Sequence, residues 1–96
     1  SKEADAAINL TGTIFDIIFT SAKKTECKVT QFTFTNGRIT LKLTGKGSQS
    51  MRNYVSAIKE NGNGYIQSVE PSMDTATDFS VSFDVVNDKL FGGSDK

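Results

Sequence analysis

The chain of 96 residues has the length of one small domain, and its eleven basic and eleven acidic residues cancel. A neutral chain argues against general binding to nucleic acid or to anionic membranes. Because it has no histidine and a single cysteine, histidine-based catalysis, histidine-liganded metals, an internal disulfide and a cysteine metal cluster are excluded.

Residues 3–21 are predicted to form an amphipathic helix, because apolar side chains recur there at the spacing of helical turns. The stripe consists of Ala4, Ala7, Ile8, Thr11, Phe15 and Ile18, and it is widened by Ile14 and Ile17. Phe19 lies off this stripe, so we expect it to cover a second surface.

A β-hairpin is predicted next, because Asn36-Gly37 separates two β-rich runs at residues 27–35 and 38–45. This dipeptide is the preferred pair for a two-residue type I′ turn, and such a turn fixes the register of both strands. The predicted opposite pairs are Thr35 with Arg38, Phe34 with Ile39, Phe32 with Leu41, and Thr30 with Leu43. In this register the large apolar side chains share one face of the hairpin.

The other face of the hairpin is the candidate interface. It carries polar side chains, and Val29 and Cys27 interrupt them. Apolar residues within a polar face, together with an exposed edge strand, suit a weak protein–protein contact. The candidate interface residues are Val29, Gln31, Thr33, Thr40 and Lys42.

The second half of the chain repeats the pattern of helix, strand and strand. A helix is predicted over residues 50–61, started by a cap at Ser48 or Ser50, and a strand over residues 65–70, closed by Pro71. A polar connection over residues 72–78 leads to a last strand, in which Phe79, Val81, Phe83 and Val85 alternate with polar residues. Residues 87–96 read as a flexible tail, in which Leu90 and Phe91 could dock.

The predicted fold class is therefore α+β, with the order α-β-β-α-β-β. Two helices on one face of a four-stranded, mainly antiparallel sheet would bury these stripes, as in a circularly permuted ferredoxin-like fold. We expect a single domain over residues 1–86. This fold hosts many functions, so the fold alone decides none of them.

Several short motifs match the pattern of a known family over residues 8–86. They are Leu43-x-Gly45-x-Gly47, a helix with Met51, Tyr54, Val55 and Ile58, Asn61-Gly62, Tyr65-Ile66-x-x-Val69, and Phe79-x-Val81-x-Phe83. In these motifs the chain resembles the PilN/PilO-type fimbrial assembly proteins of type IV pili and type II secretion systems.

The resemblance implies a scaffold without catalytic residues, cofactor or metal. It implies an extracytoplasmic, periplasmic-side domain of a protein anchored in the inner membrane by a segment absent from this chain. Its partners would be a second copy or a sister pilus-assembly protein, and other components of the inner-membrane platform, with no nucleic acid.

Two other functions stay open on the sequence. One is a small-molecule-sensing regulatory domain of ACT type, which also dimerises. The other is an acylphosphatase-like enzyme, which would need an arginine in a phosphate-binding loop, whereas Arg38 is predicted on a hairpin and Arg52 on a helix.

Three local patterns could carry chemistry, although each has a simpler structural explanation. The segment Gly45-Lys46-Gly47-Ser48 could meet a phosphate, but it lacks the spacing of a P-loop. Cys27 could be a reactive thiol, although no histidine is available as its base. Asp74, Asp78, Asp84 and Asp88 could suggest calcium, but their spacing does not fit a calcium-binding loop.

Overall fold

The computed structural model describes the backbone of residues 2–86 and the side chains of residues 12–86. It contains two helices and four strands. They are α1 (Lys2–Lys24), β1 (Lys28–Thr35), β2 (Arg38–Thr44), α2 (Ser50–Asn61), β3 (Ile66–Met73) and β4 (Asp78–Val85). The predicted tail at residues 87–96 lies outside the described residues.

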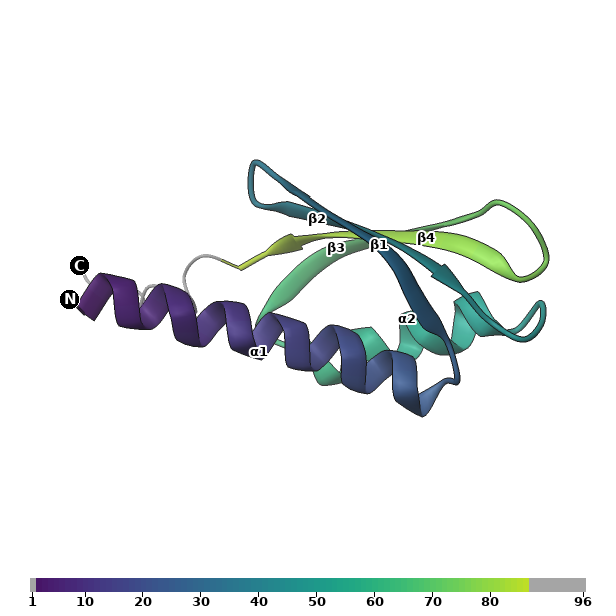
Figure 1. The fold of residues 1–96 in the computed structure, drawn as a ribbon, viewed down its shortest axis with the longest axis horizontal. Helices are drawn as coiled ribbons and strands as arrows, with labels where there is room; N and C mark the ends of the chain where they lie inside the picture. The colour runs from purple at the N-terminus through teal and green to yellow at the C-terminus, as the bar shows by residue number, and fades with distance from the viewer. Residues whose placement is uncertain (1, 87–96) are drawn as a thin grey trace.

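The strands form one sheet in the order β1-β2-β4-β3, and each neighbouring pair is antiparallel. Both helices lie on the same face of this sheet (Figure 1). The α1 helix packs against α2 and β1, and α2 packs against α1 and β3. The predicted α+β class and the element order α-β-β-α-β-β are confirmed, and the strand order is that of a circularly permuted ferredoxin-like sheet.

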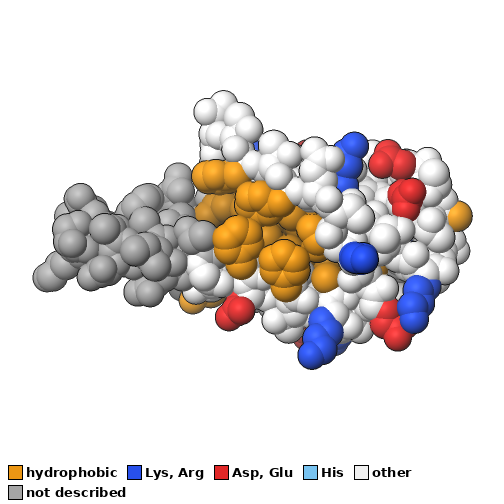
Figure 2. Space-filling view, viewed as in Figure 1, with side chains coloured by type: hydrophobic (Ala, Val, Ile, Leu, Met, Phe, Trp, Pro, Cys, Tyr) orange, Lys and Arg blue, Asp and Glu red, His pale blue; other side chains and the backbone are white. Residues whose placement is uncertain are grey.

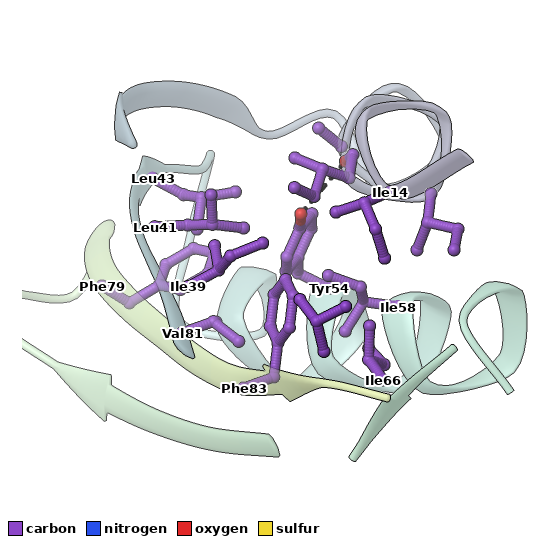
Figure 3. Packing of buried hydrophobic residues seen from close by; sticks show 14 residues of the cluster. Ile14, Ile39, Leu41, Leu43, Tyr54, Ile58, Ile66, Phe79, Val81 and Phe83 are labelled. Atoms are coloured by element: carbon purple, nitrogen blue, oxygen red, sulfur yellow. Dashed lines mark hydrogen bonds between the residues drawn. The ribbon is translucent and has the colours of Figure 1, made fainter. Parts of the chain in front are cut away.

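The hydrophobic core lies between the two helices and the two central strands. Tyr54 stands at its centre, fully buried, and points from α2 toward α1 beside Phe83 (Figure 3). The Tyr54 hydroxyl donates a hydrogen bond of 3.0 Å to the main-chain oxygen of Ile18. Asn61 Nδ2 donates a second bond, also of 3.0 Å, to Oγ of the buried Ser21. Two polar contacts therefore hold the two helices together, in addition to the apolar core.

The end of α1 lies later than predicted, at Lys24 instead of residue 21. The Cys27 N–H donates to the carbonyl of Ala22, and the Glu26 N–H to the carbonyl of Lys23. This is the Schellman pattern, whose left-handed residue is here Glu26, with φ of 59°. Glycine is the usual residue at this position, so the sequence carried no standard stop signal.

The hairpin has the predicted turn, with positive φ at Asn36 and Gly37, but a β-bulge changes its far end. The pairs from Thr35–Arg38 to Phe32–Leu41 are confirmed. Beyond Gln31 the register shifts, so Val29 and not Thr30 lies opposite Leu43. The prediction for Thr30 was therefore wrong, because one extra residue in the strand reverses the faces of all residues before it.

The strand β3 does not end at Pro71 as predicted but continues to Met73. Three of the seven residues in the predicted polar connection at residues 72–78 are strand, namely Ser72, Met73 and Asp78. A proline is tolerated here because β3 is an edge strand, where one side of the backbone needs no hydrogen-bond donor. A bulge between Gln67 and Glu70, with Ser68 at φ of 56°, interrupts the same edge.

Candidate functional site

Four phenylalanine side chains form an exposed cluster over α1 and β1, which we call the aromatic surface. They are Phe15, Phe19, Phe32 and Phe34, with exposed fractions of 38%, 52%, 39% and 58%. The Phe15 and Phe32 ring centroids lie 5.3 Å apart, and those of Phe15 and Phe19 6.2 Å apart. Figure 2 shows hydrophobic side chains gathered on this face of the molecule. A contiguous exposed apolar cluster marks an interaction site more often than scattered apolar residues do.

The position of β1 in the sheet explains why these rings are exposed. Phe32 and Phe34 share a face with Leu41 and Ile39, as the register predicted, and those β2 residues are buried. The strand β1, however, is the edge of the sheet beside α1. Three side chains of β2 are buried in the core, namely Ile39, Leu41 and Leu43, while seven of the eight residues of β1 are exposed and none is buried. The predicted face is right, but side chains on it are buried only beneath the helices.

The two edges of the sheet differ in their protection against pairing with another chain. The edge strand β3 carries a bulge, Pro71 and the charged Glu70, three features that discourage further pairing. In β1, residues 31–35 have neither charge nor proline and follow one regular register. Among the described residues, β1 pairs with β2 alone. The aromatic surface therefore borders the less protected edge.

The predicted interface residues lie on two different faces. Gln31, Thr33, Thr40 and Lys42 share the outer face of the sheet, opposite the face that carries the buried Ile39 and Leu41. Val29 lies on the inner face, half-buried against the core, and Cys27 also packs there. The bulge at Thr30 caused this difference from the prediction. Without Val29 and Cys27, the outer face along β1 and β2 loses the apolar residues that made it a candidate interface.

Polar side chains on the outer face satisfy one another. Arg38 Nη1 donates to Asp84 Oδ1 at 2.8 Å, and Arg38 Nη2 contacts Glu70 Oε1. The hydrogen bond that Arg38 donates to the Asp84 carboxylate is the main cause that raises the pKa of Arg38 above its usual value. The hydroxyls of Thr40 and Ser82 lie 3.0 Å apart. On this face the charges of Arg38, Asp84 and Glu70 are therefore paired with one another.

The candidate phosphate loop uses its main-chain donors internally. The N–H groups of Lys46 and Gly47 donate to Ser50 Oγ at 2.9 and 3.2 Å, and Gly45 N–H donates to the carbonyl of Thr77 at 2.8 Å. Ser50 is buried and thus anchors the loop instead of capping α2, whose N-cap is Gln49 without a side-chain bond. These contacts give the loop a structural role.

The remaining chemical candidates also have structural surroundings. Cys27 is half-buried, and its Sγ lies 3.4 Å from the hydroxyl of Thr25 and 3.9 Å from the carbonyl of Ser50. Within the part of the chain that the structure describes, no three acidic or cysteine side chains are grouped as metal ligands. Asp88, the last member of the predicted calcium group, lies outside the described residues.

A polar hollow of about 550 Å³ lies between the end of α1 and one side of α2. Its lining includes Lys23, Lys24, Glu26 and Glu60, and Lys24 pairs with Glu60 at 3.4 Å across it. Both of these side chains are largely exposed, so the hollow is open to solvent. An open hollow with a charged pair across it offers little to a small ligand, which usually binds in a mostly apolar pocket.

No protein-family model matches the chain, and no match was found among curated proteins or solved structures. Neither described helix has an apolar stretch of the length needed to cross a bilayer. Sequence reasoning singled out Phe19 and Phe91 as surface aromatics, and Phe91 lies outside the described residues. The Gln-Phe-Thr-Phe-Thr run at residues 31–35 does not indicate an edge position without the strand order.

Proposed function

We propose that this domain is a non-catalytic assembly module that acts through protein–protein association. The observation that carries the proposal is the aromatic surface beside the less protected edge of the sheet at β1. Aromatic side chains supply much of the binding energy at protein interfaces, because they bury large areas at a low cost in side-chain entropy. Exposed in water without a partner, four such rings would favour aggregation.

We further propose that the assembly is the inner-membrane platform of a type IV pilus or type II secretion system. The motifs shared with the PilN/PilO-type proteins support this, and the element order agrees with the order that the resemblance implies. In that setting the domain would lie on the periplasmic side of the membrane, anchored through another segment of its protein. It would bind a second copy or a sister protein there.

The ligand-sensing alternative predicts a binding cleft for a small molecule. The polar hollow beside α2 is open and carries the ion pair of Lys24 with Glu60, which does not favour that function. A thermal-shift screen with amino acids tests it directly, because a ligand that binds only the folded state raises the melting temperature.

The native, full-length protein provides the test of the proposed function. Cells that produce it should be fractionated, and the mass and N-terminal sequence of the protein determined. A membrane-bound species with an apolar span of about 20 residues before Ser1 is the expected result. A cytoplasmic protein that begins near Ser1 would overturn the platform proposal and favour ligand sensing.

A further inference from the structure

The free edge of β1 exposes main-chain groups of defined residues. A two-residue turn is closed by a hydrogen-bonded pair, here Thr35 with Arg38, and such pairs alternate along an antiparallel ladder. The N–H and C=O groups of Thr33 and Gln31 are therefore also directed toward β2. The N–H and C=O groups of Phe32 and Phe34 are directed away from β2, toward the open edge. The aromatic residues thus carry the donors and acceptors that another strand would use.

The length of this edge selects one geometry for a symmetric pair. Its regular part covers residues 31–35, between the bulge at Thr30 and the turn at Asn36-Gly37. An antiparallel partner must place residues of the same face opposite each other. A two-fold axis at Thr33, the middle residue, meets this condition and pairs all five residues. Phe32 of one copy then lies opposite Phe34 of the other, with their free main-chain groups aligned.

From this geometry we propose that two copies of the chain join by antiparallel pairing of their β1 strands about Thr33, which makes one continuous eight-stranded sheet. The inference rests on the proposed function, and it names the partner and the contact. On the inner face the pairing would bring together the Phe32 and Phe34 rings of both copies. Phe15 and Phe19 of each α1 would extend the same apolar contact.

The available area agrees with such a pair. Phenylalanine buries about 150–250 Å², and the four rings are about half exposed, so each copy offers roughly 400 Å² of aromatic surface. Two copies together with their strand edges approach the ~1,200 Å² at which specific interfaces begin. Residues 31–35 are uncharged, so no like charges oppose each other where the two edges meet.

Disulfide trapping tests the contact and its register. In a two-fold pair centred at Thr33, the two Thr33 residues form a pair without mutual hydrogen bonds, with Cα atoms about 4.5 Å apart. This spacing lies within the range of a disulfide. Thr35 of one copy would instead lie opposite Gln31 of the other, about 13 Å from its symmetry mate. Thr35→Cys is therefore a matched control on the same exposed face.

Both variants are made in a Cys27→Ser background, so that the native thiol cannot react. Each is oxidised with glutathione disulfide at about 100 μM protein and analysed on a non-reducing gel, with light scattering of the unmodified chain alongside. We expect Thr33→Cys to form a covalent dimer at least tenfold faster than Thr35→Cys.

Equal rates in a chain that is dimeric by light scattering would overturn the inference and point to another surface. Faster trapping of Thr35→Cys would overturn the register. A monomeric chain without trapping would also overturn it, and a sister protein would then be the partner to test. None of these results changes the fractionation experiment, so failure of the contact is distinguishable from failure of the proposed function.

Discussion

Phe15 of α1 and Phe32 of β1 lie against each other with ring centroids 5.3 Å apart and planes inclined at 44°. Each ring nevertheless keeps more than a third of its surface exposed, at 38% and 39%. The pair joins the helix to the edge strand and leaves one side of each ring available to a partner. The contact between α1 and β1 and the proposed interaction therefore use the same side chains.

Reversal of the charge at Lys42 tests whether self-association uses the outer face of the sheet or the aromatic surface. Lys42 is exposed on the outer face of the sheet, opposite Gln31 and Ser80. Because that face is not the proposed contact, Lys42→Glu should change the unfolding free energy by less than about 0.5 kcal/mol. Self-association, measured by sedimentation, should stay within about twofold of the unmodified chain. A large loss of association would return the interface to the outer face.

Tyr54 should make the stability of the domain decrease at alkaline pH. Its burial raises the pKa of the phenol above the ordinary value of 10.0. The unfolded chain loses this proton above about pH 10 while the folded chain retains it, so the unfolding free energy is unaffected below pH 10 and falls above it. Tyr54→Phe should reduce this decrease, and should cost about 1 kcal/mol at pH 8 through loss of the bond to Ile18.

Denaturant unfolding at pH 8 and at pH 10.5 measures this effect. The matched control is Tyr65→Phe, because Tyr65 is only partly buried and packs beside the core. The control should keep the pH dependence of the unmodified chain. If the unfolding free energy fell equally between pH 8 and pH 10.5 in the Tyr54→Phe variant and in the unmodified chain, Tyr54 would not be the cause of the decrease.

Gly45 should be intolerant of any side chain. A Cβ there would overlap Cβ and Oγ of Ser50, whose hydroxyl anchors the loop before α2. We expect Gly45→Ala to destabilise the domain by about 1–3 kcal/mol, the usual cost of overpacking a closely packed site. Gly47→Ala is the control, because a Cβ at Gly47 meets nothing within 4 Å, and it should cost much less. Thermal unfolding of both variants would compare these costs.

Glu26 occupies a left-handed position that suits glycine. With φ of 59° its backbone is strained, and its exposed ion pair with Lys46, at 3.6 Å, contributes little to stability. Glu26→Gly should therefore stabilise the domain by roughly 0.5–1 kcal/mol in denaturant unfolding. Glu26→Ala removes the same carboxylate and keeps a Cβ, so it should give no such gain. Equal effects of the two variants would exclude backbone strain as the cause.

Much of the fold could be predicted because its signals are local. The Asn36-Gly37 turn fixed the register near it, and helical spacing located α2 at residues 50–61. The bulge at Thr30 has no comparable sequence signal, since neither a glycine nor a proline marks it. Pro71 was a misleading signal, because a proline ends a central strand but is accepted on an edge.

The candidate site was less accessible to sequence reasoning, for a physical reason. Alternation shows which face of a strand a side chain shares, but burial depends on what covers that strand. Phe32 and Phe34 alternate like core residues and would be buried in a central strand. They are exposed because β1 is at the edge, and strand order is a property of the whole chain.

Sedimentation equilibrium of the unmodified chain and of two edge-strand variants measures the proposed association directly. Phe34→Lys places a charge in the aromatic surface, and Met73→Lys places one on the opposite edge, where Met73 is 48% exposed. We predict that Phe34→Lys raises the dissociation constant of the dimer at least tenfold, about 1.4 kcal/mol, while Met73→Lys changes it less than twofold. A monomeric unmodified chain, or a folded Phe34→Lys variant that associates as tightly as the unmodified chain, would contradict the account.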